Sequence, residues 1–158
     1  MSGAIYGGCH TCHLARILAC ALALATAQGA MAQEQGRALA HSYDGRWSVR
    51  LVCEETKDAN GPVRGYEYAF DATILEGGLN GRYESAQTAA YVIFTGTIGQ
   101  DGTLEIRAVG NTGRPEYSVG RTAEGTPYAY TMRGRLQGNR GEAKRRELRR
   151  CTAYFSRI

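Results

Sequence analysis

The chain has 158 residues, of which 43% are hydrophobic and 22% are charged, and its 21 glycines far outnumber its 3 prolines. This length accommodates one domain, and the composition excludes collagen-like and proline-rich disordered proteins. The formal net charge of +4 is too small to indicate nucleic-acid binding by itself.

Residues 1–32 are predicted to be a secretory signal peptide. They contain no acidic residue, one strong base (Arg16), an apolar run over residues 17–27 and the small-x-small sequence Ala-Met-Ala at 30–32. Features of this kind, in this order, are typical of a cleaved leader. The apolar run is too short to cross a membrane, which needs about twenty residues. We therefore expect a periplasmic or secreted protein without a membrane span, starting near Gln33.

Two motifs inside this leader are interpreted as coincidences. Cys9-x-x-Cys12-His13 matches the attachment motif of c-type haem, but it precedes the apolar run and would be removed with the leader. The sequence before Cys20 resembles a lipoprotein acylation box, but it lies at the start of the apolar run rather than at its end. We expect no lipid anchor and no cofactor.

Beyond the leader, the chain contains two cysteines, Cys53 and Cys151. Export to an oxidising compartment favours a disulfide between them. Two unpaired structural thiols are the alternative. The bond would join the first predicted strand to the last.

After a predicted flexible lead-in over residues 33–44, the chain alternates between apolar and polar residues with a period of two. This pattern is typical of half-buried antiparallel strands. The clearest runs lie at 47–53, 66–74, 91–98, 104–108 and 128–136, and turn pairs separate several of them: Gly77-Gly78, Asp101-Gly102 and Gly138-Asn139.

Two segments are ambiguous. Asn80-Gly81 is a turn signal inside a run of alternating residues, so 79–83 is expected to be a short or a bulged strand. Residues 142–150 have a helix-favouring composition, but Leu148 is their one large apolar residue. We interpret that segment as a strand, with a helical turn as the alternative.

Strands joined mostly by short hairpins must close or curl to bury their apolar face and protect their edges. We therefore predict an all-β fold over residues 45–158: a small antiparallel meander barrel of seven to eight strands. A two-sheet β-sandwich is the alternative.

Gly45-Arg46-Trp47 at the start of the first predicted strand resembles the G-x-W opening of lipocalin-like barrels, where the Trp would plug one barrel end. A broader resemblance, to small exported proteobacterial domains of unknown function, covers most of residues 44–157. Its segments include 44–53, 101–113, 119–130 and 146–151. Arg150 stands where that pattern has a Pro, which affects the expected local turn. The resemblance implies fold and compartment, and no activity.

The sequence offers little catalytic chemistry. His41 is the one histidine beyond the leader, and no metal-binding or phosphate-binding motif occurs. Glu67 and Asp71 share a strand face, which we expect to be solvated. A hydrolase that uses two carboxylates assembled by the fold is kept as an alternative function.

The connection 111–127 is long for a chain of hairpins, and long loops are often functional. It carries Arg114, Tyr117 and Arg121 and leads into Tyr128, and such side chains suit molecular recognition. We predict ligand binding there, and expect Tyr130 to be a core residue.

Residues 133–150 hold eight basic and two acidic residues. We predict that this basic hairpin, through Arg133, Arg145 and Arg146, binds an anionic partner, and a merely solvated face is the alternative. The leading hypothesis is an exported, non-enzymatic binding module that uses loop and hairpin. Its partner would be a small ligand, an anionic envelope component or another exported protein, and not nucleic acid. An inhibitor of an exported hydrolase is a further alternative.

Overall fold

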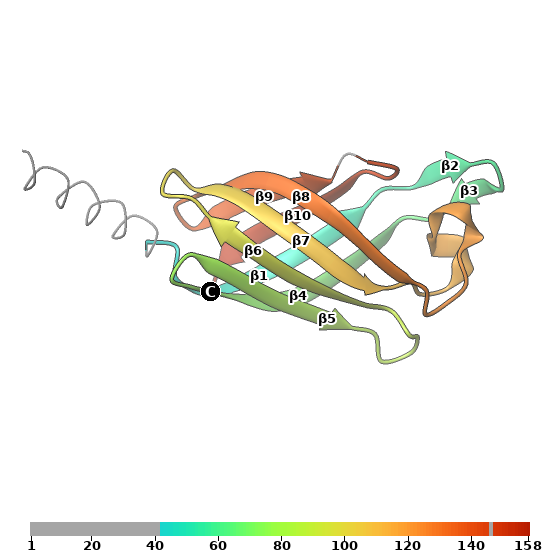
Figure 1. Cartoon of the computed structure of the whole chain (residues 1–158), viewed down its shortest axis with the longest axis horizontal. Helices are drawn as coiled ribbons and strands as arrows, with labels where there is room; N and C mark the ends of the chain where they lie inside the picture. Colours follow the sequence, from blue (N-terminus) through green and yellow to red (C-terminus); the bar gives the residue numbers. More distant parts are fainter. Residues whose placement is uncertain (1–41, 146) are drawn as a thin grey trace, which may run out of the picture. The chain divides into compact units, whose positions relative to one another are not determined.

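The computed structural model describes residues 42–145 and 147–158. Within them, eight strands form a closed antiparallel barrel, and two further strands form a separate hairpin (Figure 1). The predictions about the signal peptide, Cys9–His13, Cys20 and Gln33 lie outside the described residues, as does Arg146.

Within the described residues, the elements are strands and two short helical turns. The strands and the two single-turn 3₁₀ helices are β1 (Gly45–Cys53), β2 (Thr56–Asp58), β3 (Gly61–Val63), β4 (Tyr66–Leu75), β5 (Gly78–Glu84), β6 (Tyr91–Ile98), β7 (Thr103–Asn111), η1 (Pro115–Tyr117), η2 (Val119–Arg121), β8 (Pro127–Gln137), β9 (Arg140–Arg145) and β10 (Cys151–Arg157). In the described part of the chain, no helix is long and apolar enough to span a membrane.

The barrel order is β1-β10-β9-β8-β7-β6-β5-β4, and β1 closes it by pairing with both β4 and β10. Apart from the closing pair β1–β10, every pair joins barrel strands that follow one another in sequence order. The predicted all-β meander barrel is therefore confirmed, with eight strands, and the alternative sandwich is set aside.

Alternation decides which side chains enter the barrel. The inward positions of the barrel half near the start of β1 and the end of β10 carry large apolar residues that are fully buried, among them Trp47, Phe94, Ile106 and Leu136. At the other end of the barrel, the inward positions carry partly buried tyrosines such as Tyr66 and Tyr128. One half of the barrel is therefore filled with apolar side chains, and the other half has a polar aromatic lining.

Residues 42–44 of the predicted lead-in contact the filled end. The Tyr43 hydroxyl donates to the Leu136 carbonyl oxygen (3.2 Å), and the Trp47 indole N–H donates to the Tyr43 carbonyl oxygen (2.9 Å). The Arg157 guanidinium lies 5.8 Å from the Trp47 ring centroid. Tyr43, Trp47 and Arg157 therefore close this end of the barrel.

The structure settles the two ambiguous segments. The one expected to be a short or a bulged strand is the seven-residue strand β5, with Gly81 inside it. A Cβ at Gly81 would lie 2.9 Å from the Cβ of Ala72 and 3.1 Å from the Phe70 ring, so glycine fits this position. The strand predicted over 142–150 is correct only up to Arg145. The chain then turns, with Leu148 in the left-handed region (φ 59°), and β10 begins at Cys151.

Candidate functional site

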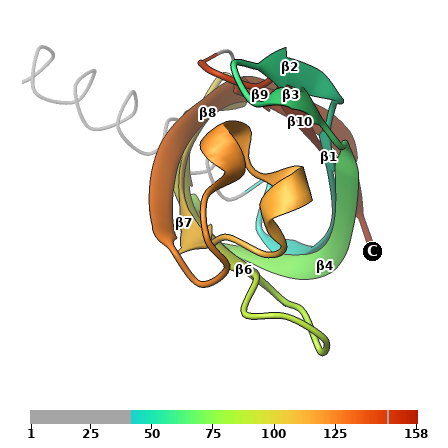
Figure 2. The same cartoon turned by 90° about the vertical axis from the view of Figure 1, so that its right-hand side faces the viewer.

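A cavity of about 590 Å³ lies at the aromatic end of the barrel. Its walls come from β4, β8 and β9, and the connection between β7 and β8 covers it. Figure 2 looks into this end and shows the two turns η1 and η2 lying across the barrel opening. The volume falls within the range of about 300–1,000 Å³ that is typical of small-molecule sites.

Four tyrosines, Tyr66 and Tyr68 on β4 and Tyr128 and Tyr130 on β8, form the aromatic wall. Each pair is separated by two positions, so both members point into the barrel. The Tyr128 and Tyr130 rings are stacked with centroids 5.7 Å apart, and Tyr68 stacks on Tyr83 at 4.0 Å. Burial raises the pKa of all four phenols above the ordinary value of 10.0, so they are neutral at physiological pH.

Tyr128 fits because its neighbour on β7 is a glycine. A Cβ on Gly110 would lie 2.9 Å from the Tyr128 hydroxyl oxygen. In the space that Gly110 leaves, the Tyr128 hydroxyl donates to the Tyr91 carbonyl oxygen (3.2 Å). This phenol is thereby fixed at the cavity wall.

Arg145, the last residue of β9, brings a positive charge into the cavity. Its guanidinium carbon lies 4.2 Å from the centroid of the Tyr130 ring. Arg145 Nε and the Tyr130 hydroxyl oxygen are both buried, and neither has a hydrogen-bond partner among the described residues. Two polar groups at the cavity wall thus have unused hydrogen-bonding capacity.

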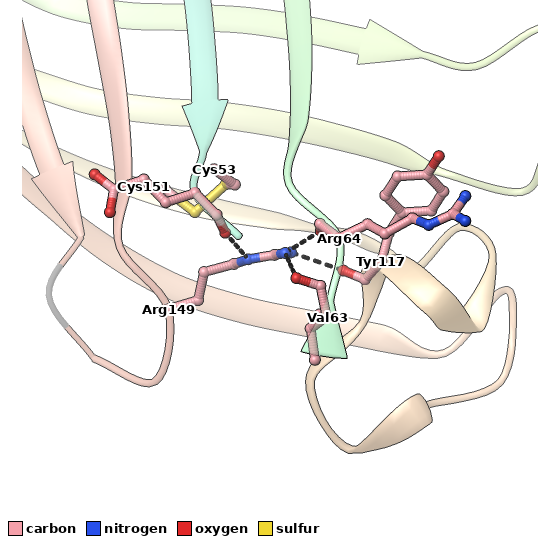
Figure 3. Close-up of a disulfide and its surroundings, with 7 residues drawn as sticks. Cys53, Val63, Arg64, Tyr117, Arg149 and Cys151 are labelled. Carbon is pink, nitrogen blue, oxygen red and sulfur yellow. Dashed lines mark hydrogen bonds between the residues drawn. A yellow bond between two sulfur atoms is a disulfide. The ribbon is translucent and has the colours of Figure 1, made fainter. Parts of the chain in front are cut away.

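Arg149 holds the cavity rim together (Figure 3). It is only 5% exposed, and its guanidinium donates to the carbonyl oxygens of Glu54 (2.9 Å), Tyr117 (2.7 Å) and Arg64. A longer contact of 3.5 Å reaches the carbonyl oxygen of Val63. One buried cation therefore links the end of β1, the end of β3, η1 and the turn before β10.

The predicted disulfide lies beside this cation (Figure 3). Cys53 and Cys151 are bonded, their Cα atoms are 4.1 Å apart, and they lie directly opposite one another on β1 and β10. The bond therefore fixes the strands from which the Arg149 contacts extend.

The β2–β3 hairpin anchors the 111–127 loop. The Asp58 carboxylate accepts the backbone N–H of Gly120 (2.6 Å), and the Arg121 guanidinium donates to the Pro62 carbonyl oxygen (2.7 Å). The Arg64 N–H donates to the Glu116 carbonyl oxygen (2.9 Å). The loop is thus a fixed cover over the barrel end and does not project away from it.

The residues predicted as a ligand site are divided by the structure. Arg114, Tyr117, Tyr128 and Arg145 line the cavity. Arg121 is absent from the lining and anchors the loop instead.

The predicted basic hairpin does not form one surface. Arg133 lies on the outer face and pairs with Glu105 (3.1 Å), and Lys144 pairs with Glu142 (2.6 Å). Arg145 and Arg149, in contrast, reach the cavity from the same segment. The structure therefore divides these cations between the outer face of the barrel and the cavity.

Glu67 is the one acidic residue of the lining, and its side chain is on the outer face, where it pairs with Arg50 (3.2 Å). Asp71 likewise pairs with Arg46 on the outside (2.8 Å). These two acids therefore do not converge in the cavity. The described residues also contain no group of three or more His, Cys, Asp or Glu side chains arranged to hold a metal ion.

Among the lining residues that sequence reasoning did not assign to the site are Tyr66, Tyr68 and Arg149, together with Tyr130, which was expected only in the core. The alternation along β4 and β8 signals the inward position of the tyrosines, but it does not say that the space between them is unfilled. No sequence signal identifies the role of Arg149, because its partners are carbonyl oxygens of three distant segments.

Comparison with known proteins gives no independent indication of function. No protein family, no curated protein and no solved structure was found to match the chain. The candidate site is therefore defined by its own geometry: an aromatic cavity with an inward-pointing arginine, under an anchored loop.

Proposed function

We propose that this protein is an exported, non-enzymatic binding module that holds a small ligand in the cavity beneath the 111–127 loop. The observation that carries the proposal is the unequal filling of the barrel. Large apolar side chains occupy one half, whereas about 590 Å³ remains open in the other. A barrel that served only as a scaffold would gain stability by filling this space.

The chemistry of the lining favours binding over hydrolysis. A glycosidase-type mechanism needs two carboxyl groups that face one another across a cleft. In the described part of the cavity, the one acid is Glu67, and its carboxylate is paired with Arg50 on the outer face. The anchored loop also gives less support to an inhibitor, which would present a projecting segment to its target.

Export is supported by two features. The Cys53–Cys151 bond is typical of proteins from oxidising compartments. Residues 1–32 have the composition of a secretory leader. We therefore place the binding function in the periplasm or outside the cell, where an envelope component is an alternative partner for the same end of the barrel.

Binding of a neutral fluorescent probe, N-phenyl-naphthylamine, tests the proposal. Ser118→Trp and Ala90→Phe introduce bulk into the cavity from two different segments that line it. Ala69→Phe is the control. It makes the same change of side chain as Ala90→Phe, but on the exposed outer face of β4. We expect the wild type and the control to bind the probe and both filling variants to lose it.

Equal probe affinity in the wild type and in both filling variants, each shown to be folded by circular dichroism, would contradict the proposal. Loss of binding in the Ala69→Phe control as well would also count against it, since the probe would then report on the surface.

A further inference from the structure

We propose that the ligand is a small anion with an aromatic body, and that Arg145 binds its acidic group. This inference rests on the proposed function, because it concerns the same cavity. It goes further in stating the chemistry of the ligand and the residue that selects it.

The first argument is unused hydrogen-bonding capacity. Buried polar groups in proteins nearly always have a partner. Tyr130 is only 9% exposed, yet its hydroxyl has no partner among the described residues, and neither does the buried Nε of Arg145. Both groups can donate to an acceptor in the cavity. An anionic oxygen is the acceptor that a guanidinium binds most strongly.

The second argument is uncompensated charge. The lining contains the cations Arg114, Arg145 and Arg149, and the carboxylate of Glu67 is engaged on the outer face. The Arg149 guanidinium already donates to backbone carbonyl oxygens. The Arg145 side chain, in contrast, has no hydrogen bond or ion pair to another described residue, and its guanidinium lies over the Tyr130 ring. The surrounding phenols are neutral because burial raises their pKa, so they do not cancel its charge.

The third argument concerns the body of the ligand. The stacked rings of Tyr128 and Tyr130 form a flat wall, and an aromatic ligand packs well against such a surface. Leu148 lines the same cavity and is 80% exposed, so a large apolar side chain is also available near the entrance. The lining thus combines aromatic faces, an exposed apolar side chain and an inner cation.

The fourth argument is access. Tyr130 and Arg145 line the cavity. The turns η1 and η2 lie across the barrel opening, and the β2–β3 hairpin lies at one side of it (Figure 2). The anchored loop restricts this opening. An extended anionic polymer would meet the outer rim, whereas a small molecule can reach both unpartnered groups.

A pair of probes that share one aromatic body tests the inference. Anilinonaphthalene sulfonate and N-phenyl-naphthylamine differ in the sulfonate that only the first carries. Each is titrated against the wild type, Arg145→Gln and Arg133→Gln. Arg133→Gln removes the same charge from the outer face, where Arg133 pairs with Glu105. The unfolding temperatures of all three proteins are compared to exclude loss of fold.

We expect Arg145→Gln to weaken sulfonate binding about ten- to hundredfold, as for a hydrogen bond to a charged group, and to leave binding of the neutral probe nearly unchanged. We expect Arg133→Gln to affect neither probe. The inference would be overturned if Arg145→Gln weakened the binding of both probes equally. It would also be overturned if Arg145→Gln and Arg133→Gln weakened sulfonate binding equally. Either result would leave the cavity as a binding site. If neither probe binds the wild type, the inference and the proposed function both fail.

Discussion

At the residue scale, the buried polar groups at the cavity end of the barrel are of two kinds. Arg149 is compensated by carbonyl oxygens, while Arg145 and Tyr130 keep unpartnered groups. The first is therefore a structural cation, and the other two are candidates for ligand contact. Substitutions at these positions should separate stability from binding.

Arg149→Gln tests the structural role. Removal of the guanidinium leaves buried carbonyl oxygens without a donor, so we expect the free energy of unfolding to fall by about 2–4 kcal/mol. Urea unfolding followed by circular dichroism measures this loss. Arg150→Gln, at the exposed neighbouring position, is the control and should change stability by less than about 0.5 kcal/mol. Similar losses in the two variants would show that Arg149 does not hold the rim.

The phenols predict the response to alkali. Burial raises the pKa of Tyr66, Tyr68, Tyr128 and Tyr130 from 10.0. The folded state keeps these protons at pH values at which the unfolded chain loses them. The free energy of unfolding should therefore be unaffected by these phenols below pH 10 and should fall as the pH rises above 10. Ultraviolet titration of the folded protein should show these tyrosines ionising only on unfolding; reversible ionisation near pH 10 would contradict their burial.

At the element scale, the cavity depends on two connections that pack against each other, the β2–β3 hairpin and the 111–127 loop. Their contact is made by hydrogen bonds to backbone groups, with Asp58 and Arg121 as the side chains. A second element-scale constraint is the bond between β1 and β10. Each constraint can be removed separately.

Asp58→Ala should release the loop. The N–H groups of Gly120 and Asn60 lower the pKa of Asp58 below its ordinary value of 3.8. The ionised carboxylate therefore stabilises the loop fully above pH 3.8, and this stabilisation is lost as the pH falls through the lowered pKa. We expect a lower protection factor against amide exchange at Gly120 in Asp58→Ala, and in the wild type at a pH below the lowered pKa of Asp58. Asp71→Ala on the outer face of β4 is the control. Unchanged exchange at Gly120 would exclude this anchor.

Removal of the disulfide should destabilise the whole barrel, because the bond connects residues separated by 98 positions. Loop-closure entropy gives an upper value of about 4–5 kcal/mol. The Cys53→Ser/Cys151→Ser double variant and the reduced wild type should lose similar amounts in urea unfolding. Two free thiols in the denatured, unreduced wild type would contradict the bond itself.

At the scale of the whole molecule, alternation and the hairpin turn signals together predicted the all-β meander barrel, with a sandwich as the alternative. The alternating runs that carry Trp47 and Leu136 turn both residues into the barrel, and the predicted bond between the first and last strands is present. The same rule would have placed Arg145 inside with Ala143, but the number of neighbouring bases suggested an exposed hairpin instead.

What the sequence could not predict is the empty space. Whether the barrel interior is filled depends on how tyrosine, glycine and arginine side chains from several strands pack together, which a single strand pattern does not describe. The rim is equally non-local: Arg149 reaches carbonyl oxygens up to 95 residues away in the chain. Site residues on the predicted loop were accessible to sequence reasoning, whereas those on the barrel wall needed the packed structure.

The central claim, that the aromatic half of the barrel is a ligand cavity, is tested most directly by amide NMR of the protein titrated with anilinonaphthalene sulfonate. We predict that chemical-shift changes gather on Tyr66, Tyr68, Tyr130, Arg145 and the 111–127 loop, while the Trp47 indole N–H at the filled end stays unchanged. Shifts confined to the outer faces of the strands, or spread evenly over both ends of the barrel, would contradict the claim.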